Sequence, residues 1–469
     1  MAAIFAVALL SHACTAQLVT TLAGGGSSGQ EPGFQNGVGT SALFQLPGGA
    51  AISIANRKVY VCDMYNNALR AVTLDGTVTT IAGGGHGAAG SQDGMGTAAG
   101  LNGPSVAATS PAWAGVFFSD QYNHKLRFCN PVSGSVCEVR TAVGGGATGS
   151  QSGSVDGEGT AALFSYPFGV AISTNGNIFV ADTENCKIRF IVFQNDAFSV
   201  TTLAGGGAGG TDAGSADGLG TAALFQEPCN VACDAAGAYV YVADTNNNKV
   251  RVIEAASGMV TTLAGGGASG TEGGASDGVG TAALISGPQG IALDEARRIL
   301  YVADVGNNKL RAVTLAGVVT TLAGGGVSGT DAGYTDGYGT AALFSWPFDV
   351  SFGGDILYVA DFNNNKIRAV ALLTPTASHS PSPSFSLSAT PTPTPTPTPS
   401  STPSGIPRQP PAAAAPASTA PAIAGACVGA LALAGAAFAL GVRIREARQQ
   451  HRGSSKIDAA PLLFAASGE

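Results

Sequence analysis

The stretch Val242 to Arg251 reads Val-Ala-Asp-Thr-Asn-Asn-Asn-Lys-Val-Arg, and close variants of it occur five more times in the chain. In every copy an Asp is followed seven residues later by an Arg, at Asp63/Arg70, Asp120/Arg127, Asp182/Arg189, Asp244/Arg251, Asp304/Arg311 and Asp361/Arg368. A second motif, Thr-Leu-Ala-Gly-Gly-Gly or a near variant, starts at Thr21, Thr80, Thr141, Thr202, Thr262 and Thr321. The chain is therefore a sixfold repeat with a period of about 60 residues, which indicates a solenoid, a propeller or another repeat array.

Each repeat contains four segments with the composition of β-strands. In the fourth repeat they cover residues 230–234, 238–243, 249–254 and 259–263, and they are rich in β-branched and aromatic residues. The chain begins with a lone fourth strand, Leu18 to Leu22, and the last repeat lacks one. If the first strand completes the last repeat, the ring closes and no strand edge is left exposed. We therefore predict an all-β, six-bladed β-propeller over residues 17–373, whereas an open solenoid would leave both ends uncovered.

A Gly-rich insert follows the fourth strand of each repeat. Gly265 to Leu284 is one example, in which Asp277-Gly278 has the composition of a tight turn and Thr281 that of the N-cap of a helical turn. Because the inserts connect blades, we expect them to project from a single face of the disc.

The ends of the chain predict a membrane protein. Residues 1–16 resemble a signal peptide, and residues 374–421 are a Pro/Ser/Thr-rich segment typical of a disordered stalk. Residues 422–442 are uncharged and long enough for a transmembrane helix. The basic residues of segment 443–469 predict a short cytoplasmic tail. We therefore expect a single-pass type I topology with the propeller extracellular or lumenal.

The repeat core Tyr-Val-Ala-Asp-x-x-Asn-Asn-Lys-Ile/Leu/Val-Arg, preceded by Pro-x-Gly-Val/Ile-Ala at 167–171 and 288–292, resembles the NHL repeat. The resemblance implies a six-bladed propeller but no single function. Members of the family include ligand- and protein-binding ectodomains, RNA-binding propellers and, more distantly, amidating lyases.

The positions where the repeat is broken are the candidates for a binding site. Because the Asp/Arg pairs occur in all six copies, we interpret them as architecture, with the Asp holding the Asn-rich turn and the Arg pairing near it. The turns of blades 6, 1 and 2, which become neighbours in a closed ring, carry aromatic residues instead of small polar ones. The candidate ligand-binding residues are Tyr65, Tyr122, His124, Trp346 and Phe362, with His86, Tyr334 and Tyr338 as possible additions on the same face. Local packing of these aromatics is the alternative.

Charge and histidine content argue against two classes of ligand, and the cysteines predict disulfides. Residues 17–373 contain 16 Lys and Arg against 27 Asp and Glu, a balance that disfavours nucleic-acid binding. The two propeller histidines, His86 and His124, belong to no metal-ligand motif, so we expect neither a metal nor a cofactor. The predicted disulfides are Cys129–Cys137, across a hairpin-like loop, and Cys186–Cys229, between blades 3 and 4.

The sequence favours a binding module at the cell surface or in an endomembrane compartment, with a protein, peptide or glycan ligand. Two alternatives remain. One is an extracellular hydrolase or lyase that uses the propeller channel, and the other is a structural or adhesion component.

Overall fold

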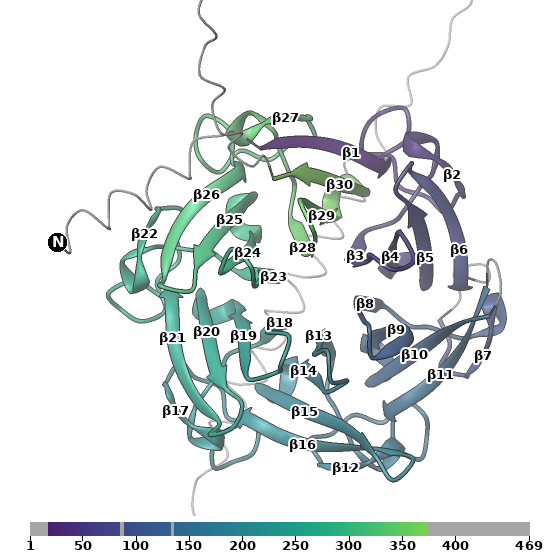
Figure 1. Cartoon of the computed structure of the whole chain (residues 1–469), viewed down its shortest axis with the longest axis vertical. Coiled ribbons are helices and arrows are strands. Elements are labelled where there is room, and N and C mark those ends of the chain that lie inside the picture. Colours follow the sequence, from purple (N-terminus) through teal and green to yellow (C-terminus); the bar gives the residue numbers. More distant parts are fainter. Residues whose placement is uncertain (1–16, 85–88, 133–135, 373–469) are drawn as a thin grey trace, which may run out of the picture. The chain divides into compact units, whose positions relative to one another are not determined.

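The computed structural model describes residues 17–84, 89–132 and 136–372. Six antiparallel sheets surround a central axis, as predicted (Figure 1). The expected signal peptide (1–16), stalk (374–421), membrane helix (422–442) and tail (443–469) lie outside the described residues. Within the described part of the chain, no helix has both the length and the apolar character needed to cross a membrane.

Four strands of each blade follow the order predicted from the sequence. The innermost strands are β3 Pro47–Ser53, β8 Pro104–Ser110, β13 Pro167–Ile172, β18 Pro228–Cys233, β23 Pro288–Asp294 and β28 Pro347–Gly353. The second strands are β4 Lys58–Asp63, β9 Trp113–Asp120, β14 Ile178–Asp182, β19 Tyr239–Asp244, β24 Ile299–Asp304 and β29 Ile356–Asp361. The third strands are β5 Ala68–Thr73, β10 Lys125–Val132, β15 Lys187–Gln194, β20 Lys249–Glu254, β25 Lys309–Thr314 and β30 Lys366–Ala371. The fourth strands are β6 Thr77–Gly83, β11 Val136–Gly144, β16 Ala197–Gly205, β21 Met259–Gly265, β26 Val318–Gly324 and β1 Leu18–Gly24.

The structure adds a fifth strand of two residues at the outer edge of every blade. These short strands are β2 Gly37–Val38, β7 Gly94–Met95, β12 Gly157–Glu158, β17 Gly218–Leu219, β22 Gly278–Val279 and β27 Gly337–Tyr338. Each belongs to a Gly-rich insert and pairs with a fourth strand, as Gly278 does with Val319. We expected the inserts to project from one face of the disc. Instead, part of each insert folds back along the outer edge of a blade. The segment is too short to show the two-residue period of a strand.

Short 3-10 turns follow two of the strands in each blade. Those that connect the second strand to the third are η3 Met64–Asn66, η5 Gln121–Asn123, η7 Thr183–Asn185, η9 Thr245–Asn247, η11 Val305–Asn307 and η13 Phe362–Asn364. Those of the inserts are η2 Gly39–Ser41, η4 Gly96–Ala98, η6 Gly159–Ala161, η8 Gly220–Ala222, η10 Gly280–Ala282 and η12 Gly339–Ala341. The N-cap prediction for Thr281 was wrong, because Thr281 lies inside η10 and Val279 occupies the N-cap position.

The first strand of the chain closes the ring. Val19 of β1 pairs with Val370 of β30 on one side and with Gly337 of β27 on the other. Blade 6 is thus built from both ends of the propeller, as predicted, and the third strand of the last blade has no exposed edge.

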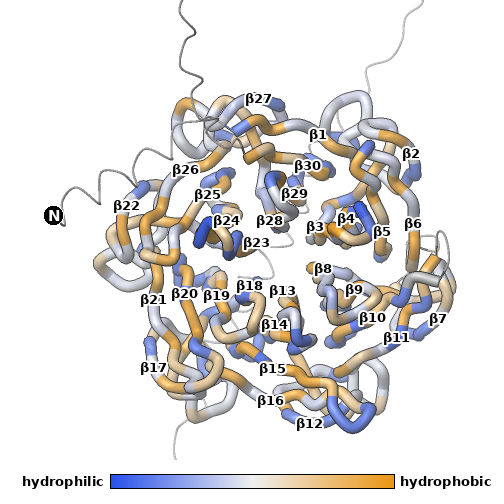
Figure 2. The backbone as a smooth tube through the Cα atoms, in the orientation of Figure 1, coloured by the Kyte–Doolittle hydropathy of each residue, from blue (hydrophilic) through white to orange (hydrophobic). Residues whose placement is uncertain are grey.

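The core lies between the blades, where the faces of neighbouring sheets meet. Val59, Val61 and Val72 of blade 1 belong to one buried cluster with Tyr358 and Ile367 of blade 6. Figure 2 shows the same distribution, with hydrophobic residues on the strands of every blade. The ring is held by six such interfaces rather than by one central core.

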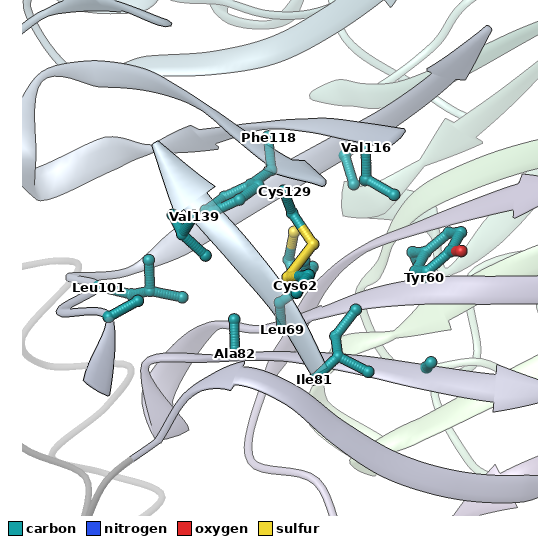
Figure 3. Close-up of a cluster of buried hydrophobic side chains, with 14 of the residues drawn as sticks. Tyr60, Cys62, Leu69, Ile81, Ala82, Leu101, Val116, Phe118, Cys129 and Val139 are labelled. Carbon is teal, nitrogen blue, oxygen red and sulfur yellow. A yellow bond between two sulfur atoms is a disulfide. The ribbon is translucent and has the colours of Figure 1, made fainter. Parts of the chain in front are cut away.

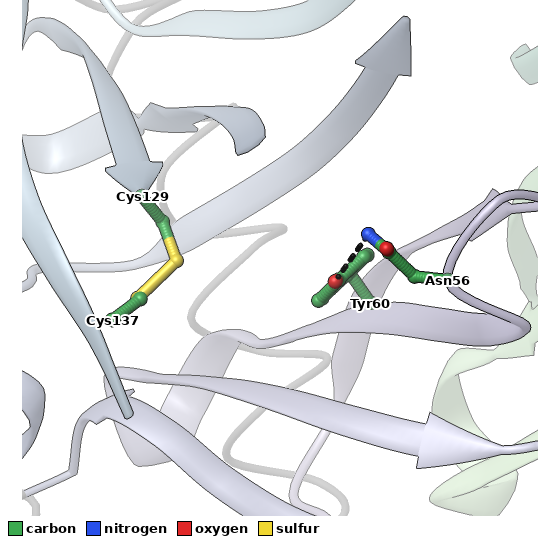
Figure 4. The surroundings of a disulfide bond; sticks show 4 residues. All are labelled: Asn56, Tyr60, Cys129 and Cys137. Carbon is green, nitrogen blue, oxygen red and sulfur yellow. Dashed lines mark hydrogen bonds between the residues drawn. A yellow bond between two sulfur atoms is a disulfide. The ribbon is translucent and has the colours of Figure 1, made fainter. Parts of the chain in front are cut away.

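The predicted bridge between Cys129 and Cys137 is confirmed. It joins β10 to β11 with Cα atoms 5.6 Å apart (Figure 4). Cys62 of the adjacent blade belongs to the same buried cluster (Figure 3). Burial, with smaller contributions from nearby aspartates including Asp349, raises the pKa of the Cys62 thiol well above its usual value, which disfavours thiolate attack on the bridge.

The second predicted bridge is absent. Cys186 and Cys229 are free thiols. The Cys229 thiol donates a hydrogen bond to the Glu227 carbonyl, and Cys186 has a hydrogen bond with the Glu227 backbone. Burial raises the pKa of Cys186 to about 11 and that of Cys229 to about 12.

Candidate functional site

The repeated Asp and Arg form a fully buried ion pair in every blade. An Arg Nη1 lies 2.6 to 2.7 Å from a carboxylate oxygen of its Asp, and neither side chain is exposed. The pairs are Arg70 with Asp63, Arg127 with Asp120, Arg189 with Asp182, Arg251 with Asp244, Arg311 with Asp304 and Arg368 with Asp361. Because all twelve side chains are enclosed, they are not available to a ligand at the surface.

The guanidinium groups reach further than the pairing near the turn that the sequence suggested. The Arg Nη2 also contacts a side chain of the insert. In blade 1 this side chain is Asn36, and in blades 2 to 6 it is Asp93, Asp156, Asp217, Asp277 and Asp336. Each Arg donates to two insert carbonyls as well: Arg127 to Gly100 and Gln92, Arg189 to Leu163 and Val155, Arg311 to Leu284 and Ser276, and Arg368 to Leu343 and Thr335. The insert lies 25 to 35 residues before its Arg, so this part of the network has no local sequence signal.

Most of the Nε atoms of these six guanidinium groups lack a hydrogen bond. Arg251 Nε donates to Asp217 at 3.0 Å. Within the described ranges, the Nε atoms without a hydrogen-bond partner are those of Arg70, Arg127, Arg189, Arg311 and Arg368. Phenylalanine rings cover several of these guanidinium groups, as Phe164 does at 4.9 Å from Arg189 and Phe344 at 5.1 Å from Arg368. Contact with a ring face offsets part of the cost of the missing hydrogen bond.

The Asp of the pair also fixes the turn that follows it. Asp244 accepts hydrogen bonds from the backbone of Gln226 at 2.9 Å and from Asn247 Nδ2 at 2.8 Å. The same Asn247 amide donates to Gly214 of the insert at 2.6 Å. Burial raises the pKa of Asp244, while Arg251 and these donors oppose the rise.

A second repeated position latches each blade to the next. The residue after each of these 3-10 turns has a positive φ, and its identities are Asn67, His124, Cys186, Asn248, Asn308 and Asn365. Where it is Asn, its side-chain oxygen accepts a backbone N–H from the following blade, as Asn248 does from Gly287 at 2.8 Å. In blade 2, His124 Nδ1 accepts the N–H of Tyr166 at 3.1 Å. Asn suits this position because it tolerates a left-handed backbone.

The repeated lysines at the start of the third strand are buried beneath the inserts, at the end of each blade where the second strand turns into the third. Each Nζ donates to a backbone carbonyl of the insert, at Ser91, Ser154, Ser215, Ala275 or Tyr334. These five ammonium groups are used for folding and are not presented to solvent. They therefore do not form the basic surface that a nucleic-acid partner needs.

The face that carries the 3-10 turns between the second and third strands, here called the turn face, gathers the aromatic residues of the broken repeats. Phe168 and Phe348, from the opposite blades 3 and 6, meet over the axis with ring centroids 5.6 Å apart. Phe362 stacks on Phe348 at 4.3 Å, and Tyr65 meets the edge of Phe362 at 6.5 Å. Trp346 is partly buried and packs against the same cluster. Of these residues, Tyr65 is the one most open to solvent, with half of its surface exposed.

A separate aromatic group lies at the junction of blades 2 and 3. The rings of Tyr122 and Tyr166 are 5.6 Å apart and nearly perpendicular, and His124 lies 4.9 Å from Tyr166. Tyr122 is 41% exposed, whereas His124 is buried. The structure thus divides the five candidate residues into two groups, Tyr65, Phe362 and Trp346 on one side and Tyr122 and His124 on the other. Tyr166 was missed, although it occupies the same position before Pro as the candidate Trp346 and the signal was therefore present in the sequence.

Of the three possible additions, the two that the structure describes do not join these groups. Tyr334 covers Lys366, and Tyr338 lies on the short outer strand β27. His86 lies outside the described residues.

The central channel contains an unrepeated polar pair. Asn230 Nδ2 of blade 4 donates to Asp349 Oδ1 of blade 6 at 2.9 Å, and the N–H of Ala50 donates to Oδ2 at 3.0 Å. Blades 1, 3 and 5 have Gly at the equivalent position, and a Cβ on Gly290 would lie 2.5 Å from the Asp349 Cα. Burial raises the pKa of Asp349 to about 7. The departure from Gly could have been found in the sequence, but the contact between two distant blades could not.

A cavity of about 200 Å³ lies beside this pair, lined mainly by the inner strands. Within residues 17–84, 89–132 and 136–372, no three His, Cys, Asp or Glu side chains are grouped to hold a metal ion.

Comparison with known proteins agrees with this architecture. Residues 164–189 match the NHL repeat family. The chain thus contains a match to the NHL repeat and is similar to NHL repeat-containing proteins. It is 31% identical over 297 residues to the chloroplastic protein SUPPRESSOR OF QUENCHING 1 of Arabidopsis thaliana, a match that covers 62% of this chain and 27% of the plant protein. It is 28% identical over 311 residues to human NHL repeat-containing protein 2, covering 61% of this chain and 41% of the human protein. The match therefore spans less than half of the length of each of these relatives.

Solved structures show the same fold at low sequence identity. An auxiliary nutrient binding protein from Bacteroides thetaiotaomicron superposes with a TM-score of 0.56 at 16% identity, covering 76% of both chains. A protein of unknown function from the same organism gives a TM-score of 0.55 at 21% identity, with the same coverage.

The latch in blade 2 predicts acid sensitivity that the Asn latches lack. Burial lowers the pKa of His124, with Glu184 opposing the shift, and protonation of Nδ1 would remove the acceptor for Tyr166 N–H. The unfolded chain, with an ordinary His pKa, binds the proton more readily, so the stability contribution is present above about pH 6.5 and is lost as the pH falls below it.

We expect His124→Asn, which installs the residue found in four other blades, to remove this dependence. The difference in Tm between the variant and the wild type, followed from pH 8 to pH 5, should move in favour of the variant as the solution becomes acidic. A difference that stays constant over this range would contradict the role of the His124 latch.

Proposed function

We propose that this NHL propeller is a binding module whose ligand, a protein, peptide or glycan, docks on the turn face. The observation that carries the proposal is the gathering of unrepeated aromatic residues on that one face. Tyr65 and Tyr122 are 50% and 41% exposed, and each lies against another ring of the turn face, Phe362 and Tyr166. Exposed aromatic rings held by neighbouring rings are typical of interaction surfaces.

The turn face supports docking better than entry into the channel. Phe168 and Phe348 cover the axis at this end, and the hydrogen-bonded pair Asn230 and Asp349 joins two non-adjacent blades across the channel. A ligand that approaches the turn face therefore meets a surface rather than a deep pocket.

One observation favours the second candidate, a hydrolase or lyase that uses the channel. Asp349 lies at the channel cavity, and its pKa of about 7 is that of a group able to exchange protons near neutral pH. Such an enzyme would have to admit its substrate from the face opposite the turn face.

We also propose that the propeller is extracellular or lumenal, in a type I protein with signal peptide 1–16, stalk 374–421, membrane helix 422–442 and cytoplasmic tail 443–469. The bridge between Cys129 and Cys137 supports this proposal, because stable disulfides are typical of oxidising compartments.

A protease-protection assay on intact cells and on sealed microsomes, with one tag directly after residue 16 and another at Glu469, tests this topology. We expect the C-terminal tag to be protected in intact cells and digested in sealed microsomes, whose cytoplasmic face is outward. The tag at residue 17 should be accessible from outside the cell or protected in the lumen. Equal access to both tags in intact samples would refute the topology.

Replacement of the two exposed tyrosines should remove ligand binding without unfolding the propeller. Tyr65→Asn and Tyr122→Asn install the residue that blades 4 and 6 carry at the same position, Asn246 and Asn363. We expect the double variant to lose at least about tenfold in affinity for ligands that the wild type selects from glycan and peptide arrays, since aromatic anchors each contribute about 1 to 2 kcal/mol. Asn246→Ala serves as the matched control, and unchanged affinity of the tyrosine variant would remove the turn face as the docking surface.

A further inference from the structure

We propose that the turn face recognises a basic peptide segment and that Tyr122, Tyr166 and Glu184 hold one of its Lys or Arg side chains. This inference rests on the proposed function, because it assigns a partner chemistry to the same face. Its evidence is the distribution of charge on that face and the geometry at the junction of blades 2 and 3.

The described residues of the turn face include several carboxylates, whereas its described basic side chains are buried. Exposed or partly exposed acidic residues on its turns and insert loops are Glu31, Glu184, Asp212, Glu227, Glu272 and Asp331. The repeated Arg and Lys side chains under this face are buried and bonded to Asp or to insert carbonyls. The other described basic residues lie elsewhere, with Arg57, Lys58, Arg297 and Arg298 in or beside the hairpins at the opposite face and Arg140 on the outer part of β11. The field of this face therefore attracts cations and repels phosphate groups.

The blade 2 and blade 3 junction supplies a site for one cationic side chain. The rings of Tyr122 and Tyr166 are nearly perpendicular with centroids 5.6 Å apart, so the edge of one ring meets the face of the other and a cation can contact only the ring surface that this pairing leaves open. Their positions are fixed by the backbone, since the N–H of Tyr122 donates to Asn102 and the N–H of Tyr166 donates to the His124 latch. An ammonium or guanidinium group is attracted to such ring faces when it lies within about 6 Å of their centroids.

Glu184 places a carboxylate beside these rings. Its backbone N–H donates to the Ser165 carbonyl at 3.2 Å, and its Oε2 accepts the Ser165 hydroxyl at 2.9 Å. Because Ser165 directly precedes Tyr166, both contacts keep Glu184 next to the aromatic group. Glu184 also raises the pKa of His124, which places its charge close to the His124 ring. The other five blades lack this combination of two tyrosines and a carboxylate.

The test uses the purified full-length chain and two fluorescein-labelled twelve-residue peptides. One contains four lysines in a Gly/Ser background, and the other is the same peptide with every lysine acetylated. By fluorescence anisotropy we expect the lysine peptide to bind at least about tenfold more tightly, and to weaken as salt rises from about 50 to 200 mM.

Variants distinguish binding at the junction of blades 2 and 3 from general electrostatic attraction of a basic peptide to an acidic protein. Glu184→Gln and Tyr166→Leu, the residue that blade 1 has at this position as Leu46, should each weaken binding about fivefold. The matched control Glu158→Gln removes the same charge from the outer edge of blade 3 and should leave affinity within about twofold.

Equal losses in the Glu184 and Glu158 variants would overturn the proposal, because they would reduce it to net charge. Equal binding of the acetylated peptide would also overturn it. If uncharged glycans or peptides bind through Tyr65 and Tyr122 while the lysine peptide does not, this inference fails and the proposed function stands. If the Tyr65 and Tyr122 variant retains all array binding, the proposed function fails first.

Discussion

The structure depends on a buried ion pair that is repeated in every blade. Burying an Arg and an Asp costs several kcal/mol of desolvation for each ion, and only good geometry with further hydrogen bonds offsets that cost. Arg251 has this geometry, because its guanidinium reaches Asp244, Asp217 and the carbonyls of Leu224 and Ala216. The same side chain joins two strands to the insert, so the insert follows the blade edge as a fixed element.

This use of charge separates the folding residues from the candidate binding residues. The repeated Asp, Arg and Lys side chains are buried and bonded inside the blades. Of the two repeated Asn positions, one bonds within its own turn, as Asn247 does, and the other bonds to the next blade, as Asn248 does. The surface character of the turn face is consequently set by the positions that differ between blades. Those positions supply Tyr65 beside Phe362 of blade 6, and Tyr122, Tyr166 and Glu184 at the junction of blades 2 and 3.

Much of the fold could be predicted from the sequence because the repeat presents each signal six times. The number of blades, the closing strand β1 and the bridge between Cys129 and Cys137 were all predicted, and β20 has the predicted bounds Lys249–Glu254. The two-residue outer strands were not, since they form only when the insert is pulled against a fourth strand. Cys186 and Cys229 were paired wrongly because contacts between blades decide where a thiol points. The candidate site was predictable in part, since broken repeat positions identified Tyr65, Tyr122 and Phe362, and the structure places all three on the turn face. The latch made by His124, the position of Tyr166 and the pair Asn230 and Asp349 depend on contacts between distant blades. Whether the five candidate residues bind a ligand stays a prediction.

A double-mutant cycle on Asp244 and Arg251 tests most directly whether the buried pair anchors the blade. Free energies of unfolding would be measured for Asp244→Ala, Arg251→Met and the double variant. The account predicts that each single variant loses about 3 to 5 kcal/mol, because it leaves a buried charge without its partner. The double variant should be destabilised by clearly less than the sum, with a coupling free energy of about 2 kcal/mol or more. Single losses of about 1 kcal/mol that add in the double variant would contradict the account.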